Sequence, residues 1–306
     1  MKNRFLSYGA GMQTFCLLVM AEQNEIQMDE VVFADTGAEH PETYDHIEKV
    51  AKPICERIGI PFTTVRMSKT VDDISHLTVD QIEQYKKMLS VTSQLETRTK
   101  KIVARAEYSY VNGIRKRTVT SLRDEIIARR RVPSINPSSR WCTSDAKIVP
   151  IYKGFIRPAQ ERGEYIKPAT AIIGIGYEEL TRMYDPHLTE YVVEYPLIER
   201  KMKRQDCVNY VHRHGYESPP KSGCYFCPFQ GPGQWKQLRE KHRDLFYDAM
   251  DLEEKDINYP TYGLIPKKGW TLRRLDGYFS DSAQLTLFSE DFRNDMQCEQ
   301  AGYCGV

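Results

Sequence analysis

The chain has 306 residues, and its 43 basic and 42 acidic residues nearly cancel to a formal charge of +1. This length suits one large domain with an appendage or two modest domains, and so balanced a charge excludes attraction to nucleic acid or membrane through a global field. Eight cysteines with a single Cys-x-x-Cys argue against a disulfide framework, and no stretch approaches the ~20 apolar residues that span a bilayer, so we expect a soluble, cytoplasmic protein.

The first predicted unit is a strand over residues 4–7, a glycine-containing turn and a helix that opens at Phe15. Glycines let the backbone approach an anion, and the first turn of a helix supplies unpaired N–H groups. The turn therefore predicts a phosphate site, although a tight turn between a buried strand and a helix is the alternative, since neither a Walker lysine nor a third glycine follows. The candidate phosphate contacts in this turn are Ser7, Tyr8, Gly9, Gly11, Gln13 and Thr14.

A second unit repeats this order. Residues 30–34 read as a buried strand, Asp35, Thr36 and Gly37 follow it, and a helix is predicted from residue 42 to about residue 59. Two such units imply a parallel sheet whose loops at the strand carboxyl ends form a ligand crevice. We therefore expect Ser7 and Asp35 to meet at one edge, and a third strand to follow at residues 61–65.

The stretches SYGAGMQT at residues 7–14, DTG at residues 35–37 and PETY at residues 41–44 resemble the PP-loop ATP pyrophosphatases, in their phosphoadenosine phosphosulfate (PAPS) reductase-like branch. The resemblance implies an adenine nucleotide whose phosphates are gripped by the first stretch, with the Asp-Thr-Gly turn beside it. The family's loop usually reads Ser-Gly-Gly-x-Asp-Ser. Gln13 stands in place of the aspartate and Thr14 in place of the last serine, a departure that bears on Mg²⁺ handling and ATP cleavage.

Residues 68–137 are polar and charged, and we interpret them as a basic helical insertion across the top of the sheet, with helices near residues 79–89 and 121–131 and no further strand before residue 171. With Tyr108 and Tyr110, its cations predict a groove for nucleic acid, whereas a solvated helical face is the alternative. The cations are Arg98, Lys100, Lys101, Arg105, Arg115, Lys116, Arg117, Arg123, Arg129, Arg130 and Arg131.

Two further candidates follow from the family resemblance. Lys147 matches a lysine that precedes a proline in PAPS reductase-like proteins, which implies a phosphate ligand. A strand over residues 171–176 leads into a segment similar to the family's Gly-Ile-Arg-x-x-Glu-Ser-x-Arg, which implies that Arg182 contacts phosphate or sulfate through its planar fork of donors. A salt bridge from Arg182 to Glu178 is the alternative.

Residues 221–228 read KSGCYFCP, and we call this segment the knuckle. Its Cys224 and Cys227 have metal-ligand spacing, which fits structural zinc, a redox dithiol or half of an iron–sulfur site. In the adenylyl-sulfate reductase branch such a pair joins upstream cysteines around a [4Fe–4S] cluster, so the resemblance implies that Cys142 is a third ligand. Cys207 could supply the fourth ligand, or a fourth could be absent, with four-cysteine zinc as the alternative.

The chain ends in a second cysteine pair, Cys298 and Cys304. Cys304 with Gly305 is similar to the C-terminal Glu-Cys-Gly motif that carries the nucleophile of PAPS and adenylyl-sulfate reductases, although Tyr303 precedes it and no histidine follows. The resemblance implies a terminal thiol that enters the site. A pair that closes on itself or binds metal is the alternative.

We therefore predict an α/β chain with a Rossmann-like parallel sheet of about five strands, similar to the adenine nucleotide alpha hydrolases, over residues 1–200, and a cysteine-rich C-terminal region over residues 201–306. The predicted function is ATP–Mg²⁺-dependent adenylylation of an acceptor, preferably nucleic acid, followed by insertion of sulfur from a donor protein, assisted by an iron–sulfur cluster. The alternatives are a reductase of adenylyl sulfate or PAPS that uses Cys304, and an inactive nucleotide- or nucleic-acid-binding regulatory protein.

Overall fold

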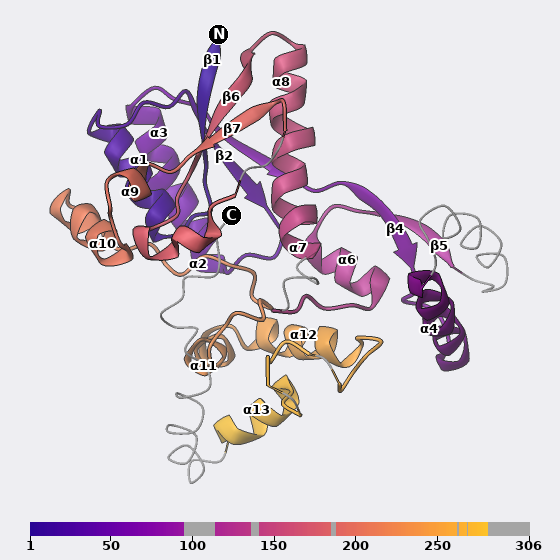
Figure 1. Cartoon of the computed structure of the whole chain (residues 1–306). Helices are drawn as coiled ribbons and strands as arrows, with labels where there is room; N and C mark the ends of the chain where they lie inside the picture. The colour runs from indigo at the N-terminus through magenta and orange to yellow at the C-terminus, as the bar shows by residue number, and fades with distance from the viewer. Residues whose placement is uncertain (95–113, 136–140, 185–187, 262, 268, 281–306) are drawn as a thin grey trace.

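The computed structural model describes residues 1–94, 114–135, 141–184, 188–261, 263–267 and 269–280, and a five-stranded parallel sheet forms its centre (Figure 1). Its strand order is β3-β2-β1-β6-β7. The predicted α/β class and five-stranded parallel sheet are confirmed. β6 begins six residues earlier than residue 171, because its first part pairs with the start of β1. The strands are β1 (Lys2–Ser7), β2 (Glu30–Asp35), β3 (Phe62–Arg66), β6 (Tyr165–Ile173) and β7 (Tyr191–Glu194).

Helices cover both faces of this sheet (Figure 1). Alternating side chains of β1 show the division: Leu6 packs towards α1, α3 and α10, whereas Phe5 packs towards the helical segment that ends in α8. The first group consists of α1 (Met12–Glu22), α2 (Pro41–His46), η1 (Ile47–Ala51), α3 (Lys52–Arg57) and α10 (Arg204–Arg213). The second consists of α7 (Trp141–Thr143), η3 (Ser144–Ile148), η4 (Pro150–Ile156) and α8 (Arg157–Glu161).

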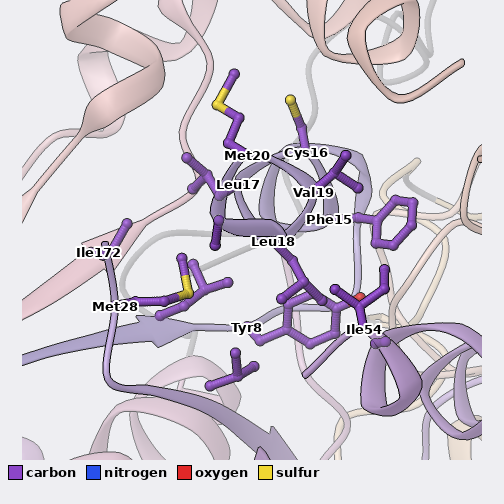
Figure 2. Packing of buried hydrophobic residues seen from close by; sticks show 14 of the residues in the cluster. Tyr8, Phe15, Cys16, Leu17, Leu18, Val19, Met20, Met28, Ile54 and Ile172 are labelled. Atoms are coloured by element: carbon purple, nitrogen blue, oxygen red, sulfur yellow. The ribbon is translucent and has the colours of Figure 1, made fainter. Parts of the chain in front are cut away.

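The α1 helix is buried on every side from Met12 to Ala21. Figure 2 shows its side chains radiating into the surrounding core, with Leu18 and Tyr8 on the side of Ile54. Helices that are apolar all round must be enclosed, and the sheet, α3 and α10 together enclose this one. The start of α1, which follows β1 directly, is therefore held rigidly at the carboxyl edge of the sheet.

The segment predicted as a helical insertion contains a β-hairpin as well as helices. β4 (Lys69–Asp73) pairs antiparallel with β5 (Arg115–Val119), so the prediction of no strand before residue 171 is wrong. The strands were hard to recognise because charged residues fill most of their positions, and only Val71 and Val119 are buried. Both predicted helices are present, as α4 (Val79–Gln94) and α6 (Leu122–Arg129).

The C-terminal part of the described chain is mainly helical. Trp235 and Phe246 are fully buried in a second core, to which α6 also contributes. The remaining helical elements of the chain are η5 (Tyr177–Arg182), α9 (Pro196–Glu199), α11 (Pro232–Lys241), α12 (Arg243–Glu254) and α13 (Leu272–Ser280). The last three lie below the sheet in Figure 1. Among the described residues no helix combines the length and apolar character needed to cross a membrane.

Candidate functional site

Residues 7–14, which we call the phosphate loop, leave the carboxyl end of β1 and enter α1. Gly11 is the N-cap of α1, and no side chain caps this end of the helix. The hydroxyl of Thr14 donates to the Gly11 carbonyl oxygen at 3.1 Å, which fixes the first turn. The amide N–H groups at the start of α1 are thus available to an anion, with Ser7 and Gly9 on the approach.

Two close approaches hold the phosphate loop in place. A Cβ atom on Gly174, just after β6, would stand 2.6 Å from Thr14 Cγ2 and 2.9 Å from the Thr14 amide nitrogen. A Cβ atom on Gly11 would stand 3.0 Å from the hydroxyl oxygen of Ser222, which belongs to the knuckle. The loop is therefore clamped between the sheet and the knuckle, although the two segments are far apart in sequence.

Tyr8 does not take the place that the sequence predicted for it. Its side chain is only 2% exposed and lies in the core beside α1, where Figure 2 shows it near Ile54. Its ring meets that of Phe62 edge to face, with the centroids 5.8 Å apart. The prediction of Tyr8 as a nucleotide contact is therefore corrected, because its side chain stabilises the fold under the loop.

The side chain of Gln13, which replaces the family's aspartate, forms hydrogen bonds within the protein. Its amide nitrogen Nε2 donates to Glu179 at 3.1 Å, and its oxygen accepts from Arg204 at 3.3 Å. Glu179 also forms an ion pair with Arg182, whose side chain is 15% exposed. Arg182 therefore pairs with Glu179, where the sequence suggested Glu178, and the pair holds its guanidinium near the N-terminus of α1 through Gln13.

Asp35 ends β2, and its carboxylate shapes the turn that follows. It accepts hydrogen bonds from the Gly37 amide at 2.8 Å, the Tyr44 hydroxyl at 2.7 Å and Arg66 Nε at 2.8 Å. Gly37 has φ +70°, and an added Cβ atom there would lie 2.7 Å from Cβ of Ser121 at the start of α6. The Asp-Thr-Gly sequence therefore produces a tight turn that the insertion packs against.

The knuckle pairs with this turn. The Cys224 thiol donates to the Thr36 hydroxyl at 3.2 Å, and the His40 amide donates to the Gly223 carbonyl at 3.2 Å. Glu39 forms an antiparallel bridge with Cys224 and accepts a hydrogen bond from Thr36 at 3.0 Å. The predicted nucleotide-bordering turn and the predicted metal-binding segment thus form one surface.

Lys147 connects the phosphate loop with the knuckle. It lines a small cavity together with Ser7. It also acts on Cys224: burial raises the pKa of the Cys224 thiol well above its ordinary value, Glu39 adds to this, and the positive charge of Lys147 opposes it. A lysine near both the phosphate loop and a buried thiol can neutralise negative charge that develops on either.

Three of the four predicted metal ligands share one environment. Cys224 belongs to the buried core that contains Trp235, and Cys142 and Cys227 are partly buried and pack against that core. Cys207 is fully buried on α10 in the other core, where it hydrogen-bonds with Cys16 of α1. The inclusion of Cys207 is therefore corrected, because the helix turns its thiol towards α1 and gives it a packing role.

The three thiols have the donor chemistry of a thiolate-bound cluster or zinc. Within the described part of the chain, however, no group of three or more His, Cys, Asp or Glu side chains is arranged to hold a metal ion. The burial that raises the Cys224 pKa favours its neutral thiol form, so a metal would have to displace that proton on binding.

Several predictions concern residues outside the described ranges, including Cys298, Cys304, Tyr108 and Tyr110. In the described part of the insertion, Arg115, Lys116 and Arg117 lie together on β5. Lys116 pairs with Asp72, and Arg117 lies 3.7 Å from Asp124, so acidic neighbours offset part of this positive charge.

Sequence analysis missed two residues that join the parts of the site. Ser222 contacts the phosphate loop, and Glu39 links the Asp-Thr-Gly turn to the knuckle. The only signal for Ser222 was its place beside Gly223 in a segment already marked by cysteines. Glu39 follows the turn by two residues and had no distinguishing pattern of its own.

Comparison with known proteins identifies one family model that matches nearly half of the chain. The family model of the phosphoadenosine phosphosulfate reductase domain matches residues 3–151, which include the phosphate loop, the Asp-Thr-Gly turn, Cys142 and Lys147. A search of curated proteins finds no match to the chain. The family includes PP-loop ATP pyrophosphatases, sulfurtransferases and PAPS reductase-like enzymes, which bind adenine nucleotides. Residues 3–151 are therefore a phosphoadenosine phosphosulfate reductase domain of the PAPS reductase-like branch of the PP-loop proteins, and this match supports an enzyme of that breadth.

Proposed function

We propose that this enzyme carries out ATP-dependent sulfur transfer. The observation that supports this most is the position of Lys147, which lines a cavity with Ser7 and acts electrostatically on the Cys224 thiol. The positive charge of Lys147 is therefore near both the phosphate loop and the knuckle. Sulfur transfer through an adenylylated intermediate requires both a nucleotide site and nearby sulfur chemistry, so this proximity favours it over nucleotide binding alone.

The reaction begins with ATP and Mg²⁺ at the phosphate loop. An oxygen of the acceptor attacks the α-phosphorus of ATP, the bond to the bridging oxygen of the β-phosphate breaks, and pyrophosphate leaves. A sulfur nucleophile then attacks the activated carbon of the acceptor, its bond to oxygen breaks, and AMP leaves. The start of α1 binds phosphate, while Lys147 and Arg182 offset the negative charge that develops.

Nucleic acid is the acceptor that we propose. The cations of β5 support it, because Arg115 and Lys116 are exposed and Arg117 is 41% exposed at its side chain. Neutralising these three residues should weaken nucleic-acid binding and reduce its salt dependence. If the intact protein binds no nucleic acid at low salt, this choice of acceptor is wrong.

We also propose that Cys142, Cys224 and Cys227 bind a [4Fe–4S] cluster, or zinc in its place, and that a sulfur-donor protein supplies sulfur. The packing of Cys142 and Cys227 against the same buried core to which Cys224 belongs supports the ligand set. A bound cluster would supply sulfur or electron chemistry beside Lys147, and the protein's own residues would orient the nucleotide towards it.

The decisive test compares products. Pyrophosphate release from ATP, dependent on an acceptor and lost in Lys147→Met, would support sulfur transfer. Release of sulfite from adenylyl sulfate or PAPS, lost in Cys304→Ser, would instead identify a thiol-dependent reductase. Tight ATP binding without product under either condition would identify a regulatory protein, which the replacement of the family's aspartate by Gln13 favours.

A further inference from the structure

Arg204 lies beside the phosphate loop, although it is far from that loop in sequence. It is the first residue of α10, and its guanidinium nitrogen Nη1 donates to Gln13 Oε1 at 3.3 Å. One helical turn further along both helices, Cys207 of α10 hydrogen-bonds with Cys16 of α1. These two contacts at matching positions hold the helices side by side with their N-termini at the same end. Arg204 therefore lies at the end of α1 where the phosphate site is predicted.

The start of α10 is fixed through its backbone. Glu178 accepts a hydrogen bond from the Arg204 amide at 2.8 Å, and Asp206 accepts one from the Lys203 amide at 2.8 Å. Among the residues that the structure describes, no carboxylate pairs with the guanidinium of Arg204, which is exposed. A guanidinium has five N–H donors, and the bond to Gln13 uses one of them. The backbone of Arg204 is thus held firmly while its side chain can still donate to an anion.

The two ends of the Gln13 amide meet opposite charges. The side chain is 8% exposed, its nitrogen donates to Glu179 at 3.1 Å, and its oxygen accepts from Arg204. Glu179 is itself 7% exposed and pairs with Arg182. An aspartate at position 13, as in the family's loop, would place a second carboxylate beside this buried one, and the two would repel. Glutamine satisfies both neighbours and so allows a second guanidinium to lie at the loop.

We propose that Arg204 binds a phosphate of the adenine nucleotide and that its charge makes ATP binding at the phosphate loop independent of Mg²⁺. The planar guanidinium presents paired N–H donors that match phosphate oxygens. Arg182 and Lys147 add positive charge at the same site. The proposal rests on the nucleotide site of the proposed function and deepens it, because Mg²⁺ then serves the cleavage of ATP and not its retention.

The test titrates the full-length protein with ATP, once with Mg²⁺ and once in EDTA, which prevents a metal ion from supplying the same charge. The wild type should bind ATP in EDTA within about threefold of its affinity with Mg²⁺. Arg204→Met should weaken ATP binding in EDTA about tenfold, the size expected for a lost charge-assisted hydrogen bond. A wild type that binds ATP only when Mg²⁺ is present would overturn the proposal.

Arg213→Met is the matched control. Arg213 is the last residue of α10, is also exposed, and loses the same charge on substitution. The helix has 10 residues and is therefore about 15 Å long, which separates Arg213 from the phosphate loop. ATP binding by Arg213→Met should match the wild type, and thermal unfolding checks that both variants are folded. If Arg204→Met and Arg213→Met bind ATP alike, Arg204 is not a phosphate ligand.

A double-mutant cycle separates direct contact from an effect that acts through Gln13. Gln13→Met removes the amide and keeps a side chain of similar size. If Arg204 holds the phosphate itself, Arg204→Met should still weaken ATP binding about tenfold in the Gln13→Met background. If Arg204 only orients Gln13, the second substitution will have no further effect, and the assignment of a direct contact is wrong.

This proposal and sulfur transfer can fail separately. A protein that binds ATP in EDTA through Arg204 but never releases pyrophosphate with an acceptor would keep the assignment of Arg204 and contradict sulfur transfer. A protein that releases pyrophosphate with an acceptor, and whose Arg204→Met variant binds ATP as the wild type does, would keep sulfur transfer and contradict the assignment of Arg204.

Discussion

Gly11 and Ser222 touch: a Cβ atom on Gly11 would stand 3.0 Å from the Ser222 hydroxyl oxygen. Such a distance is tighter than ordinary van der Waals contact, so the neighbour would have to move. The phosphate loop and the knuckle therefore depend on each other's shape. This relationship can be tested without knowing the substrate of the enzyme.

Gly11→Ala should weaken ATP binding about tenfold, or ~1.4 kcal/mol, because the new methyl group pushes Ser222 and shifts the loop. The measurement is a calorimetric or fluorescence titration with ATP. The double variant Gly11→Ala, Ser222→Ala removes the hydroxyl oxygen that the methyl group meets and should recover most of the affinity. Failure of the double variant to recover would mean that the loop was distorted by something other than this contact.

Gly174→Ala should destabilise the fold by ~1–3 kcal/mol, because its methyl group would meet both the side chain and the backbone of Thr14. Backbone cannot move aside as easily as the end of a flexible side chain. The free energy of unfolding in urea measures this effect. Gly154→Ala is the matched control: a Cβ atom at Gly154, which lies in a helical segment, meets nothing within 4 Å, so this change should be neutral or stabilising.

The cysteine variants should separate ligands from packing residues. If the proposed cluster or zinc is bound, Cys142→Ser, Cys224→Ser and Cys227→Ser should each lose it, as measured by iron, acid-labile sulfide and zinc content after anaerobic purification. Cys207→Ser should keep the metal but lower stability, because its thiol is fully buried against Cys16. Loss of metal in Cys207→Ser together with unchanged stability would reverse this assignment.

Glu253 should make the stability of the protein fall as pH rises from about 4.5 to about 7. This carboxyl is fully buried, and burial raises its pKa to about 7 in the folded protein from 4.5. Between these values the folded state binds the proton and the unfolded state releases it, so folding is favoured at the acid end. A shift of this size corresponds to ~3 kcal/mol.

The measurement is the free energy of unfolding in urea at pH 5, 6 and 8. Glu253→Gln cannot ionise and should flatten this part of the profile. It should also be less stable than the wild type at pH 5, because Glu253 accepts hydrogen bonds from the backbone amides of both Leu264 and Leu272, and a glutamine amide can accept only through its oxygen. Glu240→Gln, at an exposed position, should keep the wild-type slope.

The central sheet could be predicted because its signals are local. The apolar run at β2 and the glycines that follow β1 define strand–loop–helix units without reference to the rest of the chain. The β4–β5 hairpin could not be predicted in this way, since Lys69, Arg115 and Arg117 occupy strand positions and the buried pair Val71 and Val119 is too sparse to form a pattern.

In the candidate site, too, local sequence patterns could not predict which residues would meet. Spacing marked Cys224 and Cys227, and Cys207 was considered as a possible fourth ligand. Only packing decides which way a helix turns a side chain, and α10 turns Cys207 towards Cys16. The hydrogen bond from Arg204 to Gln13 depends on the same packing of α10 against α1, and no local pattern encodes that meeting.

The hydrogen bond between Thr36 and Cys224 spans 188 residues of chain. At synthesis rates of about 5–20 residues per second, the first half of the site leaves the ribosome roughly 10–40 s before the second half exists. During that interval the phosphate loop has no Ser222 against it and the Asp-Thr-Gly turn has no bridge partner. The nascent chain therefore cannot assemble the complete candidate site, and the clamped form of the phosphate loop is a property of the finished protein.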